Sequence, residues 1–312
     1  MSNEPGLREA ARAAHPAVRA GPALARPGRP AGRVARVPWL MARLRQNPIG
    51  LIGVLIITAT VAVALAAPLL TPYDPTAQGA RRLLPPSLAH PMGTDELGRD
   101  TFARIVYGTR VSFQVGAVAV AIALALGATI GLLAGFFGRA FDAISMRVVD
   151  IMFAFPSLVL AIVIAGLLGP SRTNAMLAIG IVYAPAYARI VRSAVLAVMS
   201  EPYLEAARVA GGTSPHIIWR HVVPNVLPPV IVMTSLSLST AILTEAGLSF
   251  LGLGTQPPEP AWGTMLNNAR TFMELAPWLA IFPGLAIMIV VLGFNLLGDG
   301  LRDILDPRLR IQ

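Results

Sequence analysis

Six long stretches without a charged residue dominate this sequence and limit the folds that it can adopt. At a rise of about 1.5 Å per residue, roughly 20 apolar residues cross the hydrocarbon core of a bilayer. The uncharged stretches comprise residues 49–70, 111–138, 151–171, 173–188, 222–244 and 275–298. The pattern predicts an all-α polytopic membrane protein with six transmembrane helices.

The composition of the 312 residues agrees with this prediction. Hydrophobic residues make up 55% of the chain and charged residues only 13%, whereas soluble domains carry about 25% charged residues. The fourth stretch, 173–188, is the shortest, because Arg172 and Arg189 bracket it, and Pro185 interrupts it. A helix of that length must lean on its neighbours or thin the bilayer.

The basic residues predict the orientation of the chain in the membrane. All 25 are arginine, and nine of them precede residue 49. If the N-terminus is cytoplasmic, 18 arginines fall on the cytoplasmic side and seven outside, which satisfies the positive-inside rule, and six spans return the C-terminus to the cytoplasm. The formal net charge of +9 therefore reflects topology rather than nucleic-acid binding. We expect a flexible Arg-rich cytoplasmic tail at 1–48 and a membrane domain at 49–312.

The missing residue types exclude several chemistries. A phosphate-binding P-loop needs a lysine, and disulfides, thiol nucleophiles and thiolate metal sites need cysteine; the sequence has neither lysine nor cysteine. We therefore expect no catalytic, cofactor-binding or metal-binding residues, and His216 and His221 are not expected to share a helical face. A secondary transporter or channel would carry charged residues within its spans. An intramembrane enzyme would need a set of catalytic residues there. The predicted spans show neither pattern.

The predicted cytoplasmic connection between the fourth and fifth spans, residues 200–225, has clear helix signals. Ser200 can cap a helix with Pro202 in its first turn, and Gly211 can end that helix. Ser214 can then start a second short helix. Taken alone, this connection could be a solvated linker in which Glu205 and Arg208 form an exposed i,i+3 pair.

The same connection resembles the EAA loop of ABC importer permease subunits. In that family Glu-Ala-Ala is followed by three residues, a glycine, nine residues, an isoleucine, one residue and Leu-Pro. The chain matches this pattern except that His221 replaces the isoleucine and Val223 the leucine. The resemblance implies that this segment, the coupling loop, docks into a groove on a cytoplasmic ATPase subunit. The expected coupling residues are Tyr203, Leu204, Glu205, Ala206, Ala207, Arg208, Gly211 and Pro224.

Residues 91–110 form a second notable segment, on the predicted external side. Thr94 can cap a helix with acidic residues in its first turn, and Asp100 and Arg104 are spaced as an i,i+4 pair. We expect an amphipathic helix at the membrane interface. Its carboxylates could also be interpreted as a metal site, but charge pairing is the favoured interpretation.

This segment is also similar to the region before the second span in C-type permeases of the dipeptide/oligopeptide/nickel importer family. A second similarity to the same proteins lies in the predicted external loop 245–274, where residues 245–266 resemble their loop between the fifth and sixth spans. The resemblance covers residues 40–310. It implies a type I ABC importer permease fold in the bacterial inner membrane, forming half of a translocation pathway. The implied partners are a homologous permease, two ATPase subunits that hold ATP and Mg, and an extracytoplasmic solute-binding protein. Dipeptides, longer peptides, nickel chelates and haem all remain open as substrates.

Two acidic residues near the predicted span ends have structural and functional interpretations. Asp150 opens the third stretch beside Arg147, and Glu245 ends the fifth. Ionisable residues at membrane depth often mark functional sites. Both lie near an expected interface, so an ion pair for Asp150 and a helix-end or loop-anchoring carboxylate for Glu245 are the favoured interpretations.

Overall fold

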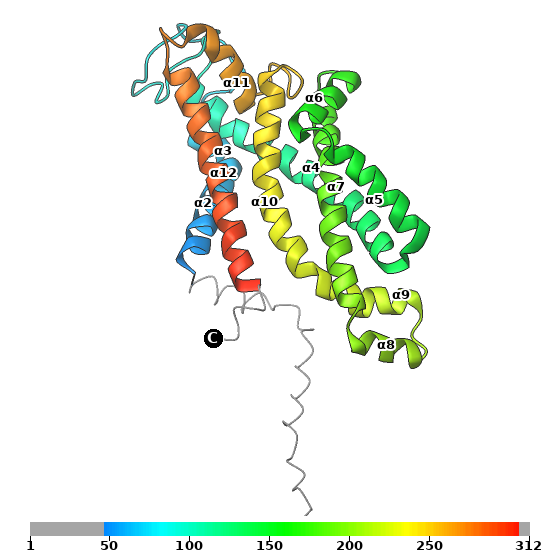
Figure 1. Ribbon diagram of the computed structural model, residues 1–312. Coiled ribbons are helices and arrows are strands. Elements are labelled where there is room, and N and C mark those ends of the chain that lie inside the picture. Colours follow the sequence, from blue (N-terminus) through cyan, green and yellow to red (C-terminus); the bar gives the residue numbers. More distant parts are fainter. Residues whose placement is uncertain (1–46, 306–312) are drawn as a thin grey trace, which may run out of the picture. The chain divides into compact units, whose positions relative to one another are not determined.

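A computed structural model describes residues 47–305 of the chain (Figure 1). Within this range every regular element is helical. An isolated antiparallel β-bridge joins Thr94 and Asp100. Residues 1–46 of the predicted Arg-rich tail, and residues 306–312, lie outside the described part.

Five of the described helices are long and apolar enough to cross a membrane. They are α2 (Pro48–Leu65), α4 (Thr101–Phe137), α7 (Arg172–Met199), α10 (Val223–Phe250) and α12 (Trp278–Leu305). Helices α5 (Arg139–Phe153) and α6 (Ser157–Leu168) are bent by 93° relative to each other and meet the same criteria only when taken together, so they add a sixth span if the bent pair makes one crossing. The prediction of an all-α polytopic membrane fold is therefore confirmed, with five or six spans, and a bent helix pair replaces the straight third span that we expected.

The shorter elements lie between the long helices. They are α3 (Ala67–Leu70), α8 (Pro202–Val209), α9 (Ser214–Ile217), a π-helical turn (Ile218–Val222), α11 (Trp262–Ala269) and a 3₁₀ turn (Arg270–Phe272).

The predicted fourth span was wrong in length. We expected residues 173–188, but α7 extends to Met199 and contains Arg189 and Arg192. These arginines do not end the helix, because carboxylates of α5 neutralise them: Arg189 pairs with Asp150, and Arg192 with Asp142. A charged residue marks the end of an apolar stretch in the sequence, but it does not mark the end of a helix when an ion partner lies on the neighbouring helix.

The second span also begins earlier than the expected residue 111. Helix α4 starts at Thr101 and runs for 37 residues, or about 55 Å at 1.5 Å per residue. It therefore exceeds the thickness of a bilayer core, and its first turns reach into the loop that precedes it. The last span is likewise displaced, from the expected 275–298 to 278–305.

Small residues bring the long helices into close contact. On α4, Cβ atoms at Gly127 and Gly131 would collide with the carbonyl oxygens of Ala184 and Ala188 on α7. Helices α2 and α12 approach in the same way where Gly53 meets the backbone of Leu297. Such backbone contacts are how helices associate in lipid, where there is no hydrophobic drive between them.

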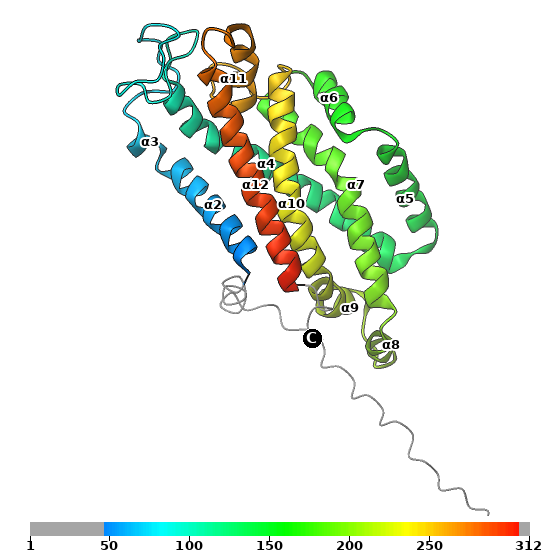
Figure 2. The ribbon, with the colours of Figure 1, turned by 60° about the vertical axis from the view of Figure 1, so that its left-hand side comes forward.

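The two ends of this bundle carry different structures (Figures 1 and 2). Helices α8 and α9 lie at the end where α2 begins and α12 finishes, and the side-chain amide of Asn47 donates to Asp303 there at 3.0 Å. The opposite end holds α3, the long loop that follows it and α11 (Figure 2). The coupling loop and both described chain ends therefore share one side.

Candidate functional site

The coupling loop folds into two short helices separated by a glycine turn. Helix α8 begins after Glu201, with Pro202 as its first residue, and α9 begins after Thr213. Each helix therefore has its cap one residue away from the expected Ser200 and Ser214. Neither cap makes a side-chain hydrogen bond, and Ser200 instead donates to the carbonyl of Ala197 at 2.8 Å.

Leu204 fixes α8 to the bundle. Its side chain is 1% exposed and packs in a cluster formed by α7, α9, the π turn and α10. The partners in this cluster are Val191, Val195, Ile217, Val222, Val226 and Val230. Of the expected coupling residues, Leu204 thus faces the bundle rather than a partner.

The other expected residues of α8 form an outward surface. Tyr203, Glu205, Ala206 and Arg208 are exposed, and Ala207 is half-buried. The expected pair between Glu205 and Arg208 is not among the ion pairs of the described residues; the Arg208 guanidinium instead lies 3.8 Å from the sulfur of Met199. The Glu205 carboxylate is consequently available to a group outside the chain.

Gly211 turns the chain back towards the membrane helices. Its φ of +86° lies in the left-handed region, which residues with a Cβ avoid. The amide of Gly211 donates to the carbonyl of Arg208 at 2.9 Å, and the amide of Gly212 to that of Ala207 at 3.0 Å. These bonds satisfy the last carbonyls of α8, as expected of a glycine-terminated helix.

The π turn at Ile218–Val222 was not predicted, although Pro224 signals it. Because proline has no N–H, residue 224 cannot donate to the carbonyl four residues before it. The amide of Val223 instead donates to Ile218, five residues back. The wider turn brings the rings of His216 and His221 to 5.9 Å between centroids, so the expectation that they point apart was wrong.

Tyr203 connects this turn to α8. The Asn225 amide donates to the Tyr203 hydroxyl at 3.2 Å and to the carbonyl of His221 at 2.6 Å. Partial burial raises the pKa of the Tyr203 phenol, and the negative charge of Glu201 adds to the effect. The phenol is therefore a neutral hydrogen-bonding group at physiological pH.

The opposite end corrects the prediction for residues 91–110. Residues 91–100 form a folded loop rather than an amphipathic helix, and α4 begins only after Asp100, whose carboxylate accepts from the amide of Ala103 at 2.7 Å. Asp100 also binds the His90 ring at 2.8 Å instead of pairing with Arg104. Thr94 caps no helix; its hydroxyl accepts from the amide of Leu84 and donates to the carbonyl of Arg81.

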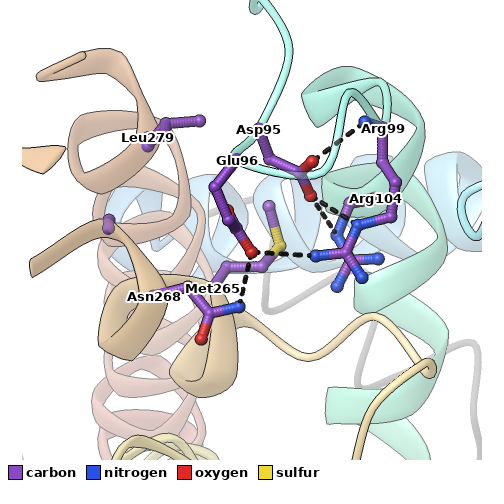
Figure 3. A pocket seen from close by; sticks show the side chains of 8 residues that line it. Asp95, Glu96, Arg99, Arg104, Met265, Asn268 and Leu279 are labelled. Atoms are coloured by element: carbon purple, nitrogen blue, oxygen red, sulfur yellow. Dashed lines mark hydrogen bonds and ion pairs between the residues drawn. The ribbon is translucent and has the colours of Figure 1, made fainter. Parts of the chain in front are cut away.

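The acidic residues of this loop are held by arginines (Figure 3). Arg99 binds Asp95 at 2.6 Å and Glu96 at 3.1 Å. Arg104 lies 3.6 Å from Asp95, and Asn268 of α11 donates to Glu96 at 3.0 Å. The cavity between them has a volume of only about 10 Å³, enough for one water, so the cluster fixes the loop to α4 and α11.

Glu245 lies deeper than predicted. Helix α10 continues to Phe250, more than one turn beyond Glu245, and the side chain is 1% exposed. Its Oε1 accepts from the Ser249 hydroxyl at 2.7 Å, and that hydroxyl accepts from the amide of Thr255 at 3.0 Å. Glu245 thus reaches the following loop through Ser249 rather than directly.

Asp150 also differs in position from the prediction. It lies in the last turn of α5, just before the break in the third span. Its partner is Arg189 of α7, at 2.7 Å, and not the nearby Arg147. The sequence could not reveal this pair, because 39 residues separate its two members.

Two family models match this chain. The family described as "Binding-protein-dependent transport system inner membrane component" matches residues 127–311, and the "N-terminal TM domain of oligopeptide transport permease C" matches residues 38–86. The first match spans more than half of the chain and includes the whole coupling loop.

Curated relatives share both the sequence and the length. The dipeptide transport system permease protein DppC of Alkalihalophilus pseudofirmus is 50% identical over 277 residues, which cover 88% of this chain and 91% of that protein. DppC of Haemophilus influenzae is 43% identical, with 85% and 92% covered. The glutathione transport system permease protein GsiD of Pectobacterium atrosepticum is also 43% identical, with 88% and 93% covered.

A solved structure shares the fold. A chain of the MetNI methionine ABC transporter, in an inward-facing conformation, aligns with a TM-score of 0.53 and 17% identity, covering 66% of this chain and 97% of that one. The broken helical bundle, the glycine-turned loop and these matches agree. The chain belongs to the binding-protein-dependent transport system inner membrane components, and it is a multi-pass permease of the bacterial inner membrane, of the kind found in dipeptide and oligopeptide ABC importers.

Proposed function

We propose that this permease forms half of the translocation pathway of an ATP-driven importer of short peptides. The relatives named above are permeases for dipeptides and glutathione, which supports a short peptide as the substrate class. A homologous second permease supplies the other half of the pathway, and an extracytoplasmic solute-binding protein delivers the peptide.

The end of the bundle that carries α8 faces the cytoplasm in this proposal. The distribution of arginines supports that orientation, as does the location of α8 at the same end of the bundle as the described chain ends (Figure 1). The opposite end, with its arginine-fixed loop and α11, then faces the solute-binding protein.

The observation that carries the proposal is that α8 has one face buried against the bundle and one face exposed. Leu204 fixes the helix to α7 and α10 from one side, while Glu205, Ala206 and Arg208 point outward from the other. Alanines permit close approach of a partner, and a free carboxylate suits a basic group. A partner that displaces α8 therefore acts on both membrane helices that Leu204 contacts.

ATP and Mg bind to partner ATPase subunits, because a chain without lysine has no P-loop. Closure of the ATPase pair on ATP moves the coupling loop, and the membrane helices change between inward-facing and outward-facing states. Reversing a 1:99 equilibrium to 99:1 requires a difference of about 5.5 kcal/mol in binding to the two states, which the nucleotide supplies.

Two substitutions in the coupling loop test the proposal. Gly211→Val places a β-branched residue at a φ of +86°, which costs roughly 1–3 kcal/mol of backbone strain. Glu205→Arg presents a cation to the basic group of the ATPase, and such like-charge contacts cost several kcal/mol. We expect both variants to insert normally but to lose ATPase co-purification, peptide uptake or both.

The matched controls lie away from the loop. A Cβ at Gly79 meets nothing within 4 Å, so Gly79→Val should co-purify with the ATPase as wild type does, and so should Glu274→Arg, because Glu274 is exposed beyond α11. If the two coupling-loop variants retain ATPase binding at the level of these controls and take up peptide at the wild-type level, the loop is a connector and the proposal is wrong.

A further inference from the structure

An exposed ion pair lies within the membrane-spanning part of this chain. Asp150 and Arg189 are 2.7 Å apart, and their side chains are 57% and 54% exposed. Arg189 lies ten residues before the end of α7, about 15 Å along the helix axis. Charged side chains at such depth face a bundle interior or a water-filled cavity rather than lipid.

A cavity of about 270 Å³ adjoins this pair. The bend between α5 and α6 contributes Met152, Phe153 and Phe155, and α7 contributes Tyr183, Pro185 and Ala186. The guanidinium of Arg189 lies 4.2 Å from the centre of the Phe153 ring, within cation–π range. The ion pair is therefore at the rim of a mainly apolar cavity.

Polar groups also meet the cavity at Tyr183, which lines it. The Tyr183 hydroxyl lies 2.6 Å from the hydroxyl of Thr244 and donates to the carbonyl of Thr240 at 3.3 Å. From Arg189 to Tyr183 the distance along α7 is about 9 Å. The contacts thus join a charged rim, an apolar cavity and a hydroxyl-rich rim into one continuous strip.

We infer that this strip lines the translocation pathway, and that the cavity receives an apolar side chain of the transported peptide. The inference rests on the proposed peptide-import function and names the surface that serves it. A zwitterionic peptide needs water or charged partners along its path, which Asp150 and Arg189 supply, while an apolar side chain gains by leaving water for the cavity.

The absence of cysteine from the sequence allows a direct test of water access. Ala186→Cys introduces the sole thiol of this chain, and its modification is measured on this chain in the transporter assembled with its partner subunits. We expect a charged methanethiosulfonate reagent to modify this thiol. We also expect the dipeptide Leu-Leu, when the binding protein delivers it, to slow the modification. Ala188→Cys, at a position that is 0% exposed, is the matched unreactive control.

The reagents distinguish the alternatives. Modification of Ala186→Cys by a lipid-soluble maleimide but not by the charged reagent means that the strip faces lipid. Resistance to both reagents means that another subunit covers the strip. Either result overturns the inference.

A second variant tests the cavity itself. Ala186→Phe fills the space, so we expect the uptake of Leu-Leu relative to Gly-Gly to fall about tenfold, the scale on which an apolar pocket discriminates side-chain size. Ala197→Phe, at an exposed position of α7 outside the cavity, should leave the ratio unchanged. The binding protein is a separate chain, so its own affinities stay the same.

The outcomes separate this inference from the function on which it rests. If the unmodified transporter takes up neither dipeptide, the proposed peptide function is overturned. If it takes up both and Ala186→Phe keeps the wild-type ratio, the cavity assignment alone is overturned.

Discussion

Two arginines, Arg99 and Arg104, are almost completely buried at the end of the molecule opposite the coupling loop. Their side chains are 4% and 2% exposed. Arg104 contacts Asp95 and also donates to the carbonyl of Pro75 at 2.9 Å. One guanidinium thus connects α4 to two separate parts of the preceding loop, and a side chain with fewer donors could not do so.

We predict that Arg104→Met strongly destabilises this end of the protein. Without Arg104, Arg99 alone faces the two carboxylates of Asp95 and Glu96, and the carbonyl of Pro75 loses its donor; breaking a buried pair typically costs about 3–5 kcal/mol. The midpoint of thermal denaturation of the assembled transporter in detergent should fall accordingly. Arg82→Met, at an exposed position in the same loop, is the control, and equal midpoints for the two variants would contradict a structural role for Arg104.

At the scale of elements, the contact between α4 and α7 depends on glycines spaced four residues apart. A Cβ at Gly131 would lie 2.9 Å from the Cβ of Val191, and one at Gly135 would lie 2.8 Å from the Cβ of Val195. The two helices therefore touch along several turns with their backbones in close approach. This contact positions α7, which carries Arg189 and leads directly into the coupling loop.

We predict that Gly131→Val separates these helices. Overpacking of this kind costs roughly 1–3 kcal/mol, and here the added Cβ also meets the backbone of α7 at the carbonyl of Ala188. The yield of the assembled transporter after detergent extraction should fall. Gly166→Val, on α6 where a Cβ meets nothing within 4 Å, should give a wild-type yield; a normal yield for Gly131→Val would show that α4 and α7 can separate without loss.

Single elements also show what the sequence could and could not predict. The apolar stretches and the Pro and Gly residues of the coupling loop are local signals, and they located the apolar segments and α8, but not the ends of the spanning helices or the bend between α5 and α6. The extension of α7 past Arg189 and the burial of Leu204 depend on residues distant in the sequence, so no local pattern contains them. The helix that we predicted at 91–100 was wrong because Asp95 and Glu96 bind the nearby Arg99 instead of starting a helix, and Glu96 also binds Asn268, 172 residues away.

At the scale of the whole molecule, the proposed orientation makes one end of the bundle accessible to reagents outside the cell and the end with the coupling loop accessible only from the cytoplasm. We predict that Gly79→Cys is labelled by an impermeant maleimide added outside cells, and that Val209→Cys is labelled only after the membrane is opened. Val209 is 84% exposed at the coupling loop, and a Cβ at residue 79 has open space around it. Labelling of Val209→Cys from outside would reverse the orientation and remove the basis for ATPase docking.

The two membrane helices that flank the coupling loop differ in stiffness. Helix α7 enters the loop after 28 residues with one internal proline, whereas α10 leaves it through the π turn and three prolines at 224, 228 and 229. A force applied to α8 would therefore bend α10 near its start, whereas α7 is uninterrupted over the roughly 21 Å between the coupling loop and Pro185. Helix α7 spans about 42 Å in all, and at its far end Arg172 binds Glu259 of the opposite loop at 3.0 Å. Mechanical work done at one membrane surface thus has a continuous helical route to the other, with a single hinge on the way.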